Sequence, residues 1–323
     1  MILSIVTPSY NQGAYLAETI RSVLSQEGDF YLDYLVMDGD SDDDSVSIIK
    51  HYEHLLAEGG IATRCRGIRY RWQSEKDSGQ AEALMKGFRL AEGEILAWIN
   101  SDDVYLPGTL QAVTLWFRDN PGSGLMYGAA HYTDESGKVI GSYPTEKFDL
   151  KKLPYFNFFC QPSTFFRKSV FQHVGGLDER LNYAMDYDLF VRIAKQFPCI
   201  YTPVYFSNYR LHETSKTMNS EFLLKYYEEI LRLTLKYFNW APLNQVYGFC
   251  NCYSISRLPV FLKKIKFIVI CLSIVCTLIH SIRLNRGLKW QDLKLLTRAN
   301  LMKIFGNRLL IIGGQQLPDH KAS

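Results

Sequence analysis

Four short apolar runs alternate with helical patterns over the first hundred residues, and this alternation restricts the possible folds more than any other feature of the sequence. The predicted strands are residues 3–7, 33–38, 67–73 and 94–100. The predicted helices are residues 14–26, a stretch that begins near Asp44, and residues 80–90. Strands that alternate with helices of about a dozen residues form βαβ units, which build a parallel sheet. We therefore predict an α/β fold with a mostly parallel sheet flanked by helices.

The pattern changes in the middle of the chain. Glu135-Ser136-Gly137 is typical of a hairpin turn, so we expect antiparallel strands to join the sheet there. A helix is predicted from Asp186 to about Gln196, followed by a strand at 199–206. After Thr214 the pattern is helical, which indicates a C-terminal helical region.

Polar residues follow each of the four predicted parallel strands. They are Thr7 to Asn11, Asp38-Gly39, Glu75 to Gln80, and Ser101-Asp102-Asp103. Because ligands bind outside the carboxyl ends of the strands in an open parallel sheet, we expect these residues to form one site. The adjacent carboxylates Asp102 and Asp103 repel each other, which predicts a positive partner such as a metal ion. Capping of a following helix is the alternative for each acidic stretch.

Several other kinds of site are excluded by the sequence. It contains no Gly-x-x-x-x-Gly-Lys, Gly-x-Gly-x-x-Gly or Gly-x-Ser-x-Gly motif. An EF-hand that starts at Asp38 is excluded because position six is Asp43 rather than Gly and position twelve is Ile49 rather than Glu. The seven cysteines form no Cys-x-x-Cys pair and "MILSIVTPSY" lacks a basic n-region, so we expect free thiols, no signal peptide and a cytoplasmic location.

The basic charge is concentrated at the C-terminal end. Residues 257–323 contain 12 Lys and Arg against two Asp, whereas the rest of the chain contains 24 basic and 31 acidic residues. A weakly acidic body with a basic tail predicts a separate partner for each.

Residues 267–279 of this tail form a 13-residue run without a charge, flanked on both sides by Lys and Arg. A spanning helix needs about 20 apolar residues, so the run is short for one. Basic flanks favour a segment that lies at the surface of an anionic membrane. Packing against the rest of the protein or against a sister chain is the alternative.

Four blocks of the sequence, taken in order and spacing, resemble an inverting family-2 nucleotide-sugar glycosyltransferase of the GT-A fold. The blocks are 4–26 with "VTPSYNQ", 34–52 with "VMDGDSDD", 74–110 with "SEKDSGQ" and "INSDD", and 161–194 with "MDYDLF". The similarity is to the bacterial branch that builds O-antigens and other surface polysaccharides. It implies a Rossmann-like catalytic domain over 1–215, with a nucleotide-sugar-binding half (1–105) and an acceptor-binding half (106–215), before a basic helical region (216–323).

The resemblance also implies roles for individual residues. Asp186 matches the catalytic base, Asp103 matches the ligand of a divalent metal ion, and His212 matches a histidine that helps hold the metal or the leaving group. The nucleotide sugar would be bound by Thr7, Pro8, Tyr10, Asp38, Asp77, Gly79, Gln80 and Asp102. Mg²⁺ or Mn²⁺ suits such oxygen ligands and a diphosphate leaving group.

The implied partners are a UDP-sugar donor and a glycan or lipid-linked acceptor, with no nucleic acid. The implied location is the inner face of the cell membrane, with membrane contact through residues 257–308.

Helix geometry distinguishes the two acids of "MDYDLF". At about 100° per residue, Asp186 lies on the same side as the apolar residues Phe190, Ile193 and Phe197, which we expect to face the sheet. Asp188 lies about 200° away and is predicted to point to solvent or to cap the helix. The alternative for Asp186 is that it is itself the N-cap.

Two rival functions have weaker support. A sugar-1-phosphate nucleotidyltransferase would carry a Gly-rich, Arg-containing phosphate loop after the first strand, where this chain has "PSYNQGAY". A non-catalytic nucleotide-binding scaffold would not need both Asp103 and Asp186.

Overall fold

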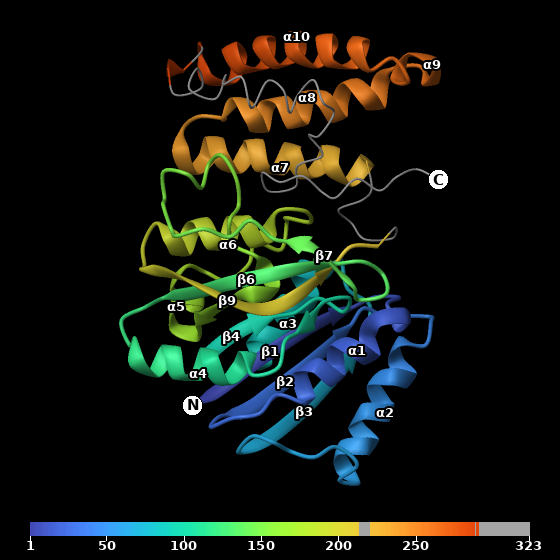
Figure 1. Cartoon of the computed structure of the whole chain (residues 1–323), viewed down its shortest axis with the longest axis vertical. Coiled ribbons are helices and arrows are strands. Elements are labelled where there is room, and N and C mark those ends of the chain that lie inside the picture. Colours follow the sequence, from blue (N-terminus) through green and yellow to red (C-terminus); the bar gives the residue numbers. More distant parts are fainter. Residues whose placement is uncertain (213–219, 288, 291–323) are drawn as a thin grey trace. The chain divides into compact units, whose positions relative to one another are not determined.

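A computed structural model describes residues 1–212, 220–287 and 289–290 (Figure 1). The chain divides into two compact units. The first comprises Met1–Phe148 and Phe159–Arg210, and the second comprises Asp149–Phe158 and Leu211–Ser323.

The first unit is built on one mixed sheet (Figure 1). Among the described residues its nine strands are β1 (Ile2–Ser9), β2 (Tyr31–Asp38), β3 (Gly67–Ser74), β4 (Ile95–Trp98), β5 (Val104–Tyr105), β6 (Leu125–Thr133), β7 (Val139–Ser142), β8 (Thr164–Arg167) and β9 (Cys199–Arg210). The order is β3-β2-β1-β4-β8-β6-β9-β5, with β7 paired to β6. The strands β1 to β4 are parallel, and β9 is parallel to β6, whereas β5, β7 and β8 pair antiparallel with their neighbours. The predicted parallel strands and the antiparallel hairpin are therefore confirmed.

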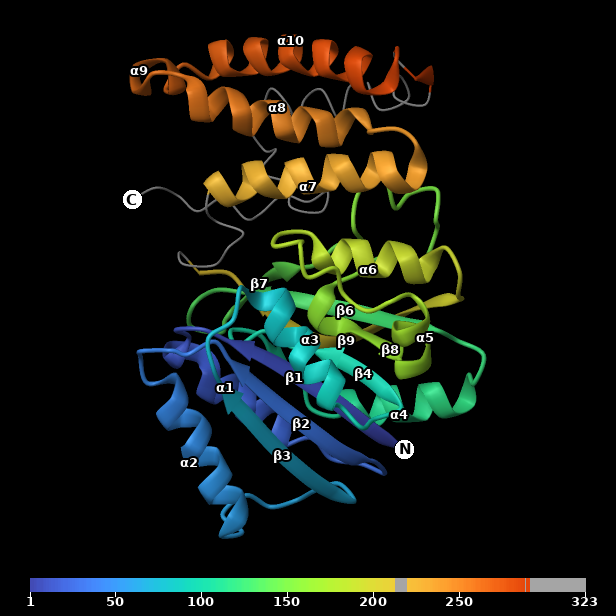
Figure 2. The same cartoon turned by 180° about the vertical axis from the view of Figure 1, so that it is seen from behind.

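Helices cover both faces of this sheet (Figures 1 and 2). They are α1 (Gly13–Leu24), α2 (Ser45–Ala57), α3 (Gln80–Leu90), α4 (Thr109–Asp119), α5 (Lys168–His173) and α6 (Met185–Ala194), with a 3₁₀ turn η1 (Gln161–Ser163). One core cluster joins α1, α2 and α4 to the strands through residues such as Leu16, Ile49 and Val113. On the other face, the Trp98 ring of β4 contacts Phe88 of α3 and stacks on Phe190 of α6. Because both faces are covered, the central strands are buried along nearly their whole length and are mostly apolar.

The register of the parallel strands brings their carboxyl ends together. Ser9 at the end of β1 pairs with Asp38 at the end of β2, and Asp38 pairs with Ser74 at the end of β3. The polar residues that follow these strands therefore begin at the same edge of the sheet.

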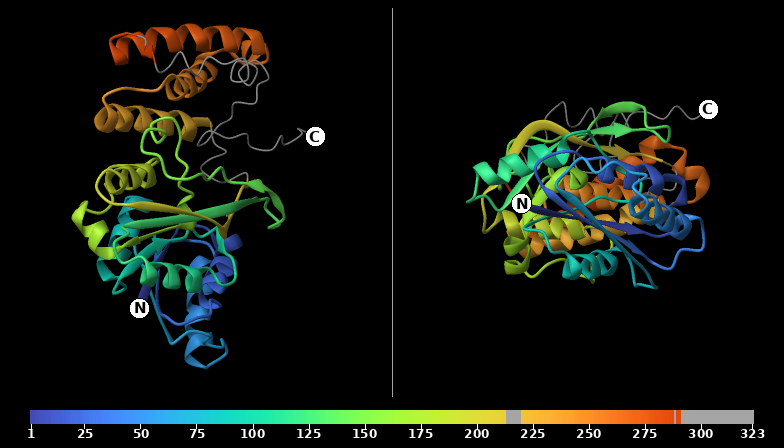
Figure 3. Two further views of the ribbon diagram at one scale, coloured as in Figure 1. Left: turned by 60° about the vertical axis from the view of Figure 1, so that its left-hand side comes forward. Right: turned by 90° about the horizontal axis from the view of Figure 1, so that it is seen from below.

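The second unit is helical in its described part (Figure 3). Its helices are α7 (Ser220–Phe238), α8 (Leu243–Arg257), α9 (Val260–Lys263) and α10 (Lys266–Asn285). The helix α8 packs against both α7 and α10.

The apolar run 267–279 is part of a longer helix than the run alone indicates. The helix α10 has 20 residues and is long and apolar enough to cross a membrane, by length and composition only. The sequence predicts that this segment is too short for a spanning helix. That prediction is wrong for the length of the helix, because His280 to Asn285 continue the helix beyond the apolar run. Residues 291–308 of the predicted membrane-contact segment, and residues 216–219 of the predicted helical region, lie outside the described residues.

A buried ion pair crosses the parallel half of the sheet. Asp33, in the middle of β2, accepts hydrogen bonds from the Ser4 hydroxyl (2.6 Å), the Arg71 guanidinium (2.5 Å) and the Glu92 amide (2.9 Å). Its side chain is 4% exposed. A second pair, Asp29 with Arg66, has the same chemistry but is about half exposed.

We expect Asp33→Ala to lower the free energy of unfolding by about 3 kcal/mol or more, because it leaves the Ser4 hydroxyl and the Glu92 amide without their acceptor and leaves Arg71 only a long, half-exposed pair with Glu92. Asp29→Ala is the control and should cost less than about 1 kcal/mol, because solvent already screens that pair. Urea unfolding followed by tryptophan fluorescence measures both. Equal losses in the two variants would contradict the burial argument.

Candidate active site

The carboxylate of Asp38 lies at the end of β2 and is held by hydroxyl groups. It is buried and accepts hydrogen bonds from the backbone N–H of Ser41 (3.0 Å), the hydroxyl of Ser41 (2.6 Å) and the hydroxyl of Ser74 (2.7 Å). The predicted nucleotide-binding acid is thus fixed in position by the loop after β2 and by the end of β3. Ser74 was not predicted, although its position at a strand exit is the signal that could have identified it.

Gly39 allows two other predicted residues to approach the end of β2. A Cβ atom at position 39 would lie 2.9 Å from a carboxylate oxygen of Asp77 and 3.3 Å from the ring of Tyr10. Tyr10 is exposed, whereas Asp77 is half-buried and accepts a hydrogen bond from the Gly79 N–H (2.9 Å). Burial is the main cause that raises the pKa of Asp77 above its ordinary value. The structure therefore brings Tyr10, Asp38 and Asp77 together.

A chain of side-chain amides connects the start of α3 to the adjacent acids. The Gln80 side-chain amide donates to Oδ1 of Asn100 (2.7 Å), and Nδ2 of Asn100 donates to the Asp103 carboxylate over 3.4 Å. Gly79 has a φ of 139°, which favours glycine, and a Cβ there would lie 3.3 Å from Oδ1 of Asn182. The loop before α6 therefore reaches the start of α3, and Asn100 and Asn182 join the predicted set.

Asp103 is a buried carboxylate whose hydrogen bonds, among the described residues, all come from amide groups. One oxygen accepts the Arg210 backbone N–H (3.0 Å), and the other accepts the long hydrogen bond from Asn100. Burial raises the pKa of Asp103 well above its ordinary value, and the neighbouring Asp102 raises it further. Asp102 and Asp103 are adjacent carboxylates, and among the described residues no cation lies at bonding distance from the buried one, Asp103. Carboxylate oxygens are ligands that a hard divalent metal ion prefers, so this pair fits such an ion.

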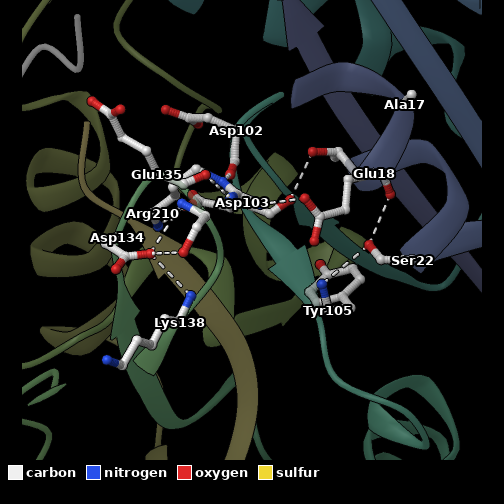
Figure 4. A network of polar contacts seen from close by, with 12 residues as sticks. Ala17, Glu18, Ser22, Asp102, Asp103, Tyr105, Asp134, Glu135, Lys138 and Arg210 are labelled. Atoms are coloured by element: carbon white, nitrogen blue, oxygen red, sulfur yellow. Dashed lines mark hydrogen bonds and ion pairs between the residues drawn. The ribbon is translucent and has the colours of Figure 1, made fainter. Parts of the chain in front are cut away.

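The guanidinium of Arg210, at the end of β9, holds the segments around these acids together (Figure 4). It donates from Nε to the Asp102 carbonyl (3.0 Å), from Nη1 to the Glu135 carbonyl (2.8 Å) and from Nη2 to the Glu18 carboxylate (2.5 Å). It also lies 5.0 Å from the centre of the Tyr15 ring. Arg210 is 4% exposed. The local sequence pattern did not identify this residue, because its partners lie between 75 and 192 positions away along the chain.

The two acids of α6 differ in a way that helix geometry did not predict. Asp188 is completely buried, and one of its carboxylate oxygens accepts hydrogen bonds from Nε (2.8 Å) and Nη2 (2.6 Å) of Arg192. The prediction that Asp188 points to solvent or caps the helix is therefore wrong. The reason is that α6 is buried on nearly all sides rather than on one face. Asp186 is the more accessible of the two, because it is only partly buried in the first turn.

Asp103 and Asp186 both influence the same buried thiol, that of Cys160. Burial raises the pKa of Cys160, and the negative charges of Asp103 and Asp186 both add to the rise. Phe190, one turn after Asp186, stacks on Trp98, which lies at the end of β4 just before the acidic loop. The first turn of α6 thus belongs to the same region as the ends of the parallel strands.

Three further predicted residues have other surroundings. Thr7 is fully buried and its hydroxyl pairs with the Tyr34 hydroxyl (3.0 Å), so its predicted contact with the nucleotide stays a prediction. Pro8 is buried in β1 opposite Met37. His212 is buried at the start of the second unit, two residues beyond β9, and its role stays a prediction.

Comparison with known proteins identifies a family. Residues 4–175 match the family model described as Glycosyl transferase family 2. The PGL/p-HBAD biosynthesis glycosyltransferase of Mycobacterium tuberculosis is 28% identical over 193 residues, which is 59% of this chain and 69% of that protein. An uncharacterized glycosyltransferase of Rickettsia prowazekii is 24% identical over 275 residues, covering 83% of this chain and 81% of that protein. One of Methanocaldococcus jannaschii is 24% identical over 196 residues, and the chain spans only 64% of its length.

Solved structures show the same fold. A fragment of S. aureus TarS in complex with UDP-GlcNAc has a TM-score of 0.53 at 14% identity, covering 95% of this chain and 92% of that one. The mannosyltransferase PcManGT from Pyrobaculum calidifontis, in complex with GDP-Man and Mn²⁺, has a TM-score of 0.52 at 14% identity, covering 94% and 80%. Together with the family match, these likenesses confirm the predicted GT-A-like α/β fold with a C-terminal helical region.

The contacts of Arg210 lead to a prediction about stability. We expect Arg210→Lys to lower the free energy of unfolding by about 2 kcal/mol or more, because an ammonium group cannot reach all three acceptors and leaves buried carbonyl oxygens unpaired. Amide hydrogen exchange should also become faster in residues 102–106. Arg180→Lys is the control, since Arg180 is 85% exposed and bonds only its near neighbour Asp178 among the described residues. Similar unfolding curves for the two variants would contradict the role given to Arg210.

Proposed function

The chain belongs to glycosyl transferase family 2, and from this membership we propose that it transfers a sugar from a nucleotide-diphosphate donor to a hydroxyl group of a glycan acceptor, with inversion at the anomeric carbon. The main support is the gathering of acids from three separate segments at the carboxyl ends of the parallel strands β2, β3 and β4. Asp38 and Asp77 are held side by side around Gly39, and Asp102 and Asp103 follow β4.

The proposed donor is a UDP-sugar. In this proposal the nucleoside lies against Tyr10, Asp38 and Asp77, and Gly79 and Gln80 approach the diphosphate at the start of α3. The exposed Tyr10 ring offers an apolar surface for a base, and the hydroxyl-bound carboxylate of Asp38 offers a fixed acceptor for ribose hydroxyls. The solved neighbours TarS and PcManGT bind UDP-GlcNAc and GDP-Man respectively, which supports a nucleotide-sugar donor.

Asp102 is proposed to contact the ribose, and Asp103 beside it is proposed to hold Mg²⁺ or Mn²⁺. A divalent cation bound there supplies the positive charge that stabilises a departing diphosphate. The chain's own contribution is to keep the Asp103 carboxylate buried and aligned through the Arg210 and Asn100 amides. For His212, which belongs to the second unit, the role of a metal or leaving-group contact stays the one that the sequence resemblance implies.

Asp186 is the proposed general base. It would remove the proton from the acceptor hydroxyl while that oxygen attacks the anomeric carbon from the face opposite the diphosphate. Asp188 is unsuited to this role because it is completely buried and its carboxylate is neutralised by Arg192. The proposed acceptor is a glycan or lipid-linked intermediate of bacterial surface-polysaccharide synthesis, bound by the half of the domain after residue 105.

The first prediction tests the donor and the metal together. We expect the protein to bind UDP in the presence of Mn²⁺ and to hydrolyse one or more members of a panel of UDP- and GDP-sugars slowly. Asp103→Asn should weaken UDP binding in Mn²⁺ by at least about tenfold, because it removes a ligand charge. The fold should remain intact, since the substitution keeps the shape and removes a buried negative charge. Isothermal calorimetry and thermal unfolding measure the two effects.

The matched control is Asp119→Asn, at the exposed end of α4, which should change neither quantity. Unchanged UDP affinity in Asp103→Asn would contradict the metal assignment. Binding of UDP without hydrolysis of any sugar nucleotide in the panel would favour the non-catalytic nucleotide-binding scaffold over an enzyme.

The second prediction separates the two acids of α6. Asp186→Asn should retain UDP and Mn²⁺ binding but lower the transfer rate by a factor of about 10² or more, because the base is lost. Asp188→Asn should retain its rate per folded molecule but lose about 2 kcal/mol or more of unfolding free energy, because a buried ion pair is broken. Rate measurements at saturating donor and urea unfolding give both values. An inactive but stable Asp188→Asn protein would show that the base is misassigned.

A further inference from the structure

The helix α10 of the second unit has an inverted distribution of polar and apolar residues. Its buried residues recur at four-residue spacing, which places them on one side of the helix. This buried stripe consists of Val269, Ser273, Thr277, Ser281 and Asn285, and Ile270 beside it is buried as well. A surface helix of a soluble protein normally buries its apolar side. Here four of the six buried residues of the helix are polar.

The polar stripe is bonded to α8 and to the residues just before it. The Ser273 hydroxyl donates to the Asn251 side chain (3.2 Å). The Asn285 amide donates to the Ala241 carbonyl (2.9 Å), and the Ala241 N–H donates back to the Asn285 oxygen (2.8 Å). Small and hydrogen-bonding residues at a helix–helix contact are typical of helices whose other side faces lipid.

The opposite side of α10, which we call the outer face, is apolar and exposed. It consists of Phe267, Leu272, Val275, Leu278, Ile279 and Ile282. Phe267 is 69% exposed and Ile279 is 60% exposed. Val260 and Phe261 in the preceding helix α9 are also exposed. Apolar side chains gathered along one helix in this way mark a binding surface rather than ordinary solvent exposure.

The surroundings of the outer face carry positive charge only. Residues 257–290 contain no Asp or Glu. Their basic residues are Arg257, Lys263, Lys264, Lys266, Arg283, Arg286 and Lys289. Lys263, Lys264 and Lys266 precede the outer face and are exposed, as are Arg283 and Arg286 at its other end. The partner that complements an apolar surface with cationic ends is a lipid surface with anionic headgroups.

We propose that the outer face of α10, together with α9, lies in the surface of an anionic lipid bilayer, with the helix parallel to the membrane plane. The polar stripe stays bonded to α8, so only the outer face enters the apolar layer. The flanking Lys and Arg side chains reach the headgroups at both ends. This inference does not depend on the proposed sugar transfer.

Two other occupants explain the observations less well. A second copy of this chain would bring two acid-free, basic segments together, and the like charges would repel. A membrane-spanning α10 would also have charged residues at both ends, as the structure has them. Its polar stripe, however, is hydrogen-bonded to α8, so α8 would have to enter the bilayer beside it. The helix α8 is too polar for that.

Sedimentation of the full-length chain with vesicles tests the proposal. We expect it to pellet with vesicles of phosphatidylcholine mixed with phosphatidylserine, and at least about tenfold less with phosphatidylcholine alone, because each Lys or Arg near an anionic surface adds about fivefold to partition. The bound protein should be released by sodium carbonate, as a protein at the membrane surface is.

Two variants test the two halves of the surface. The double variant Val275→Glu and Ile279→Glu should bind the anionic vesicles at least about tenfold more weakly, because it places charges on the apolar side. Its control, Val139→Glu with Val204→Glu, changes similarly exposed valines of the first unit and should bind like the unmodified chain.

The second variant replaces Lys263, Lys264 and Lys266 together by Gln. It should bind the anionic vesicles more weakly, and its binding should depend less on salt. The same change at Lys138, Lys147 and Lys151 is its control.

Several outcomes would overturn the proposal. The full chain could remain in the supernatant with anionic vesicles, or the Val275→Glu and Ile279→Glu variant could bind as well as its control. Resistance to carbonate would identify a spanning helix instead. Light scattering that gives a dimer mass for the unmodified chain and a monomer mass for this variant would identify a second copy as the occupant.

Discussion

The parallel register of the first strands is the constraint on which the candidate site depends. Ser9, Asp38 and Ser74 occupy equivalent positions in three neighbouring strands. Whatever follows these strands must begin within a few ångströms of the same edge, whatever its distance along the chain. The hydroxyl groups bonded to Asp38 and the close approach at Gly39 are consequences of this register. A shift of one residue would send these side chains to the opposite face.

A gathering of acids at one edge needs an opposing charge, and Arg210 supplies part of it. Its guanidinium reaches a carboxylate and two carbonyl oxygens on three separate segments, while its backbone N–H bonds Asp103. The planar fork of an arginine suits this task because its donors point in fixed directions. Glu18 is half exposed, so the net electrostatic gain from that pair is reduced by solvent. The larger contribution is that buried carbonyl oxygens are not left unpaired.

The sequence predicts the elements well where a local pattern determines them. The strands that carry Asp38 and Asp103, and the helix that begins at Gln80, follow from hydrophobic periodicity and strand-exit residues. The surroundings of Asp188 do not follow from a local pattern, because burial on both sides of α6 is a property of the packed domain. Arg210 is also invisible to local reasoning, since its partners come from distant segments. The length of α10 was underestimated because an uncharged run ends before the helix does.

The order of the strands along the chain has a consequence for the time at which the acidic loop becomes fixed. The strands β1 to β4 are complete by residue 98, and they pair mainly with one another. The backbone of the Asp102–Asp103 loop is already bonded to α1, because the Thr19 hydroxyl donates to the Asp103 carbonyl. The Asp103 carboxylate, however, takes its shorter hydrogen bond from Arg210 at the end of β9, more than a hundred residues later. Contacts that close such long loops form late in folding. A chain that is still being synthesised is therefore expected to complete its parallel half first, and the Asp103 carboxylate gains this hydrogen bond only when the last strand docks.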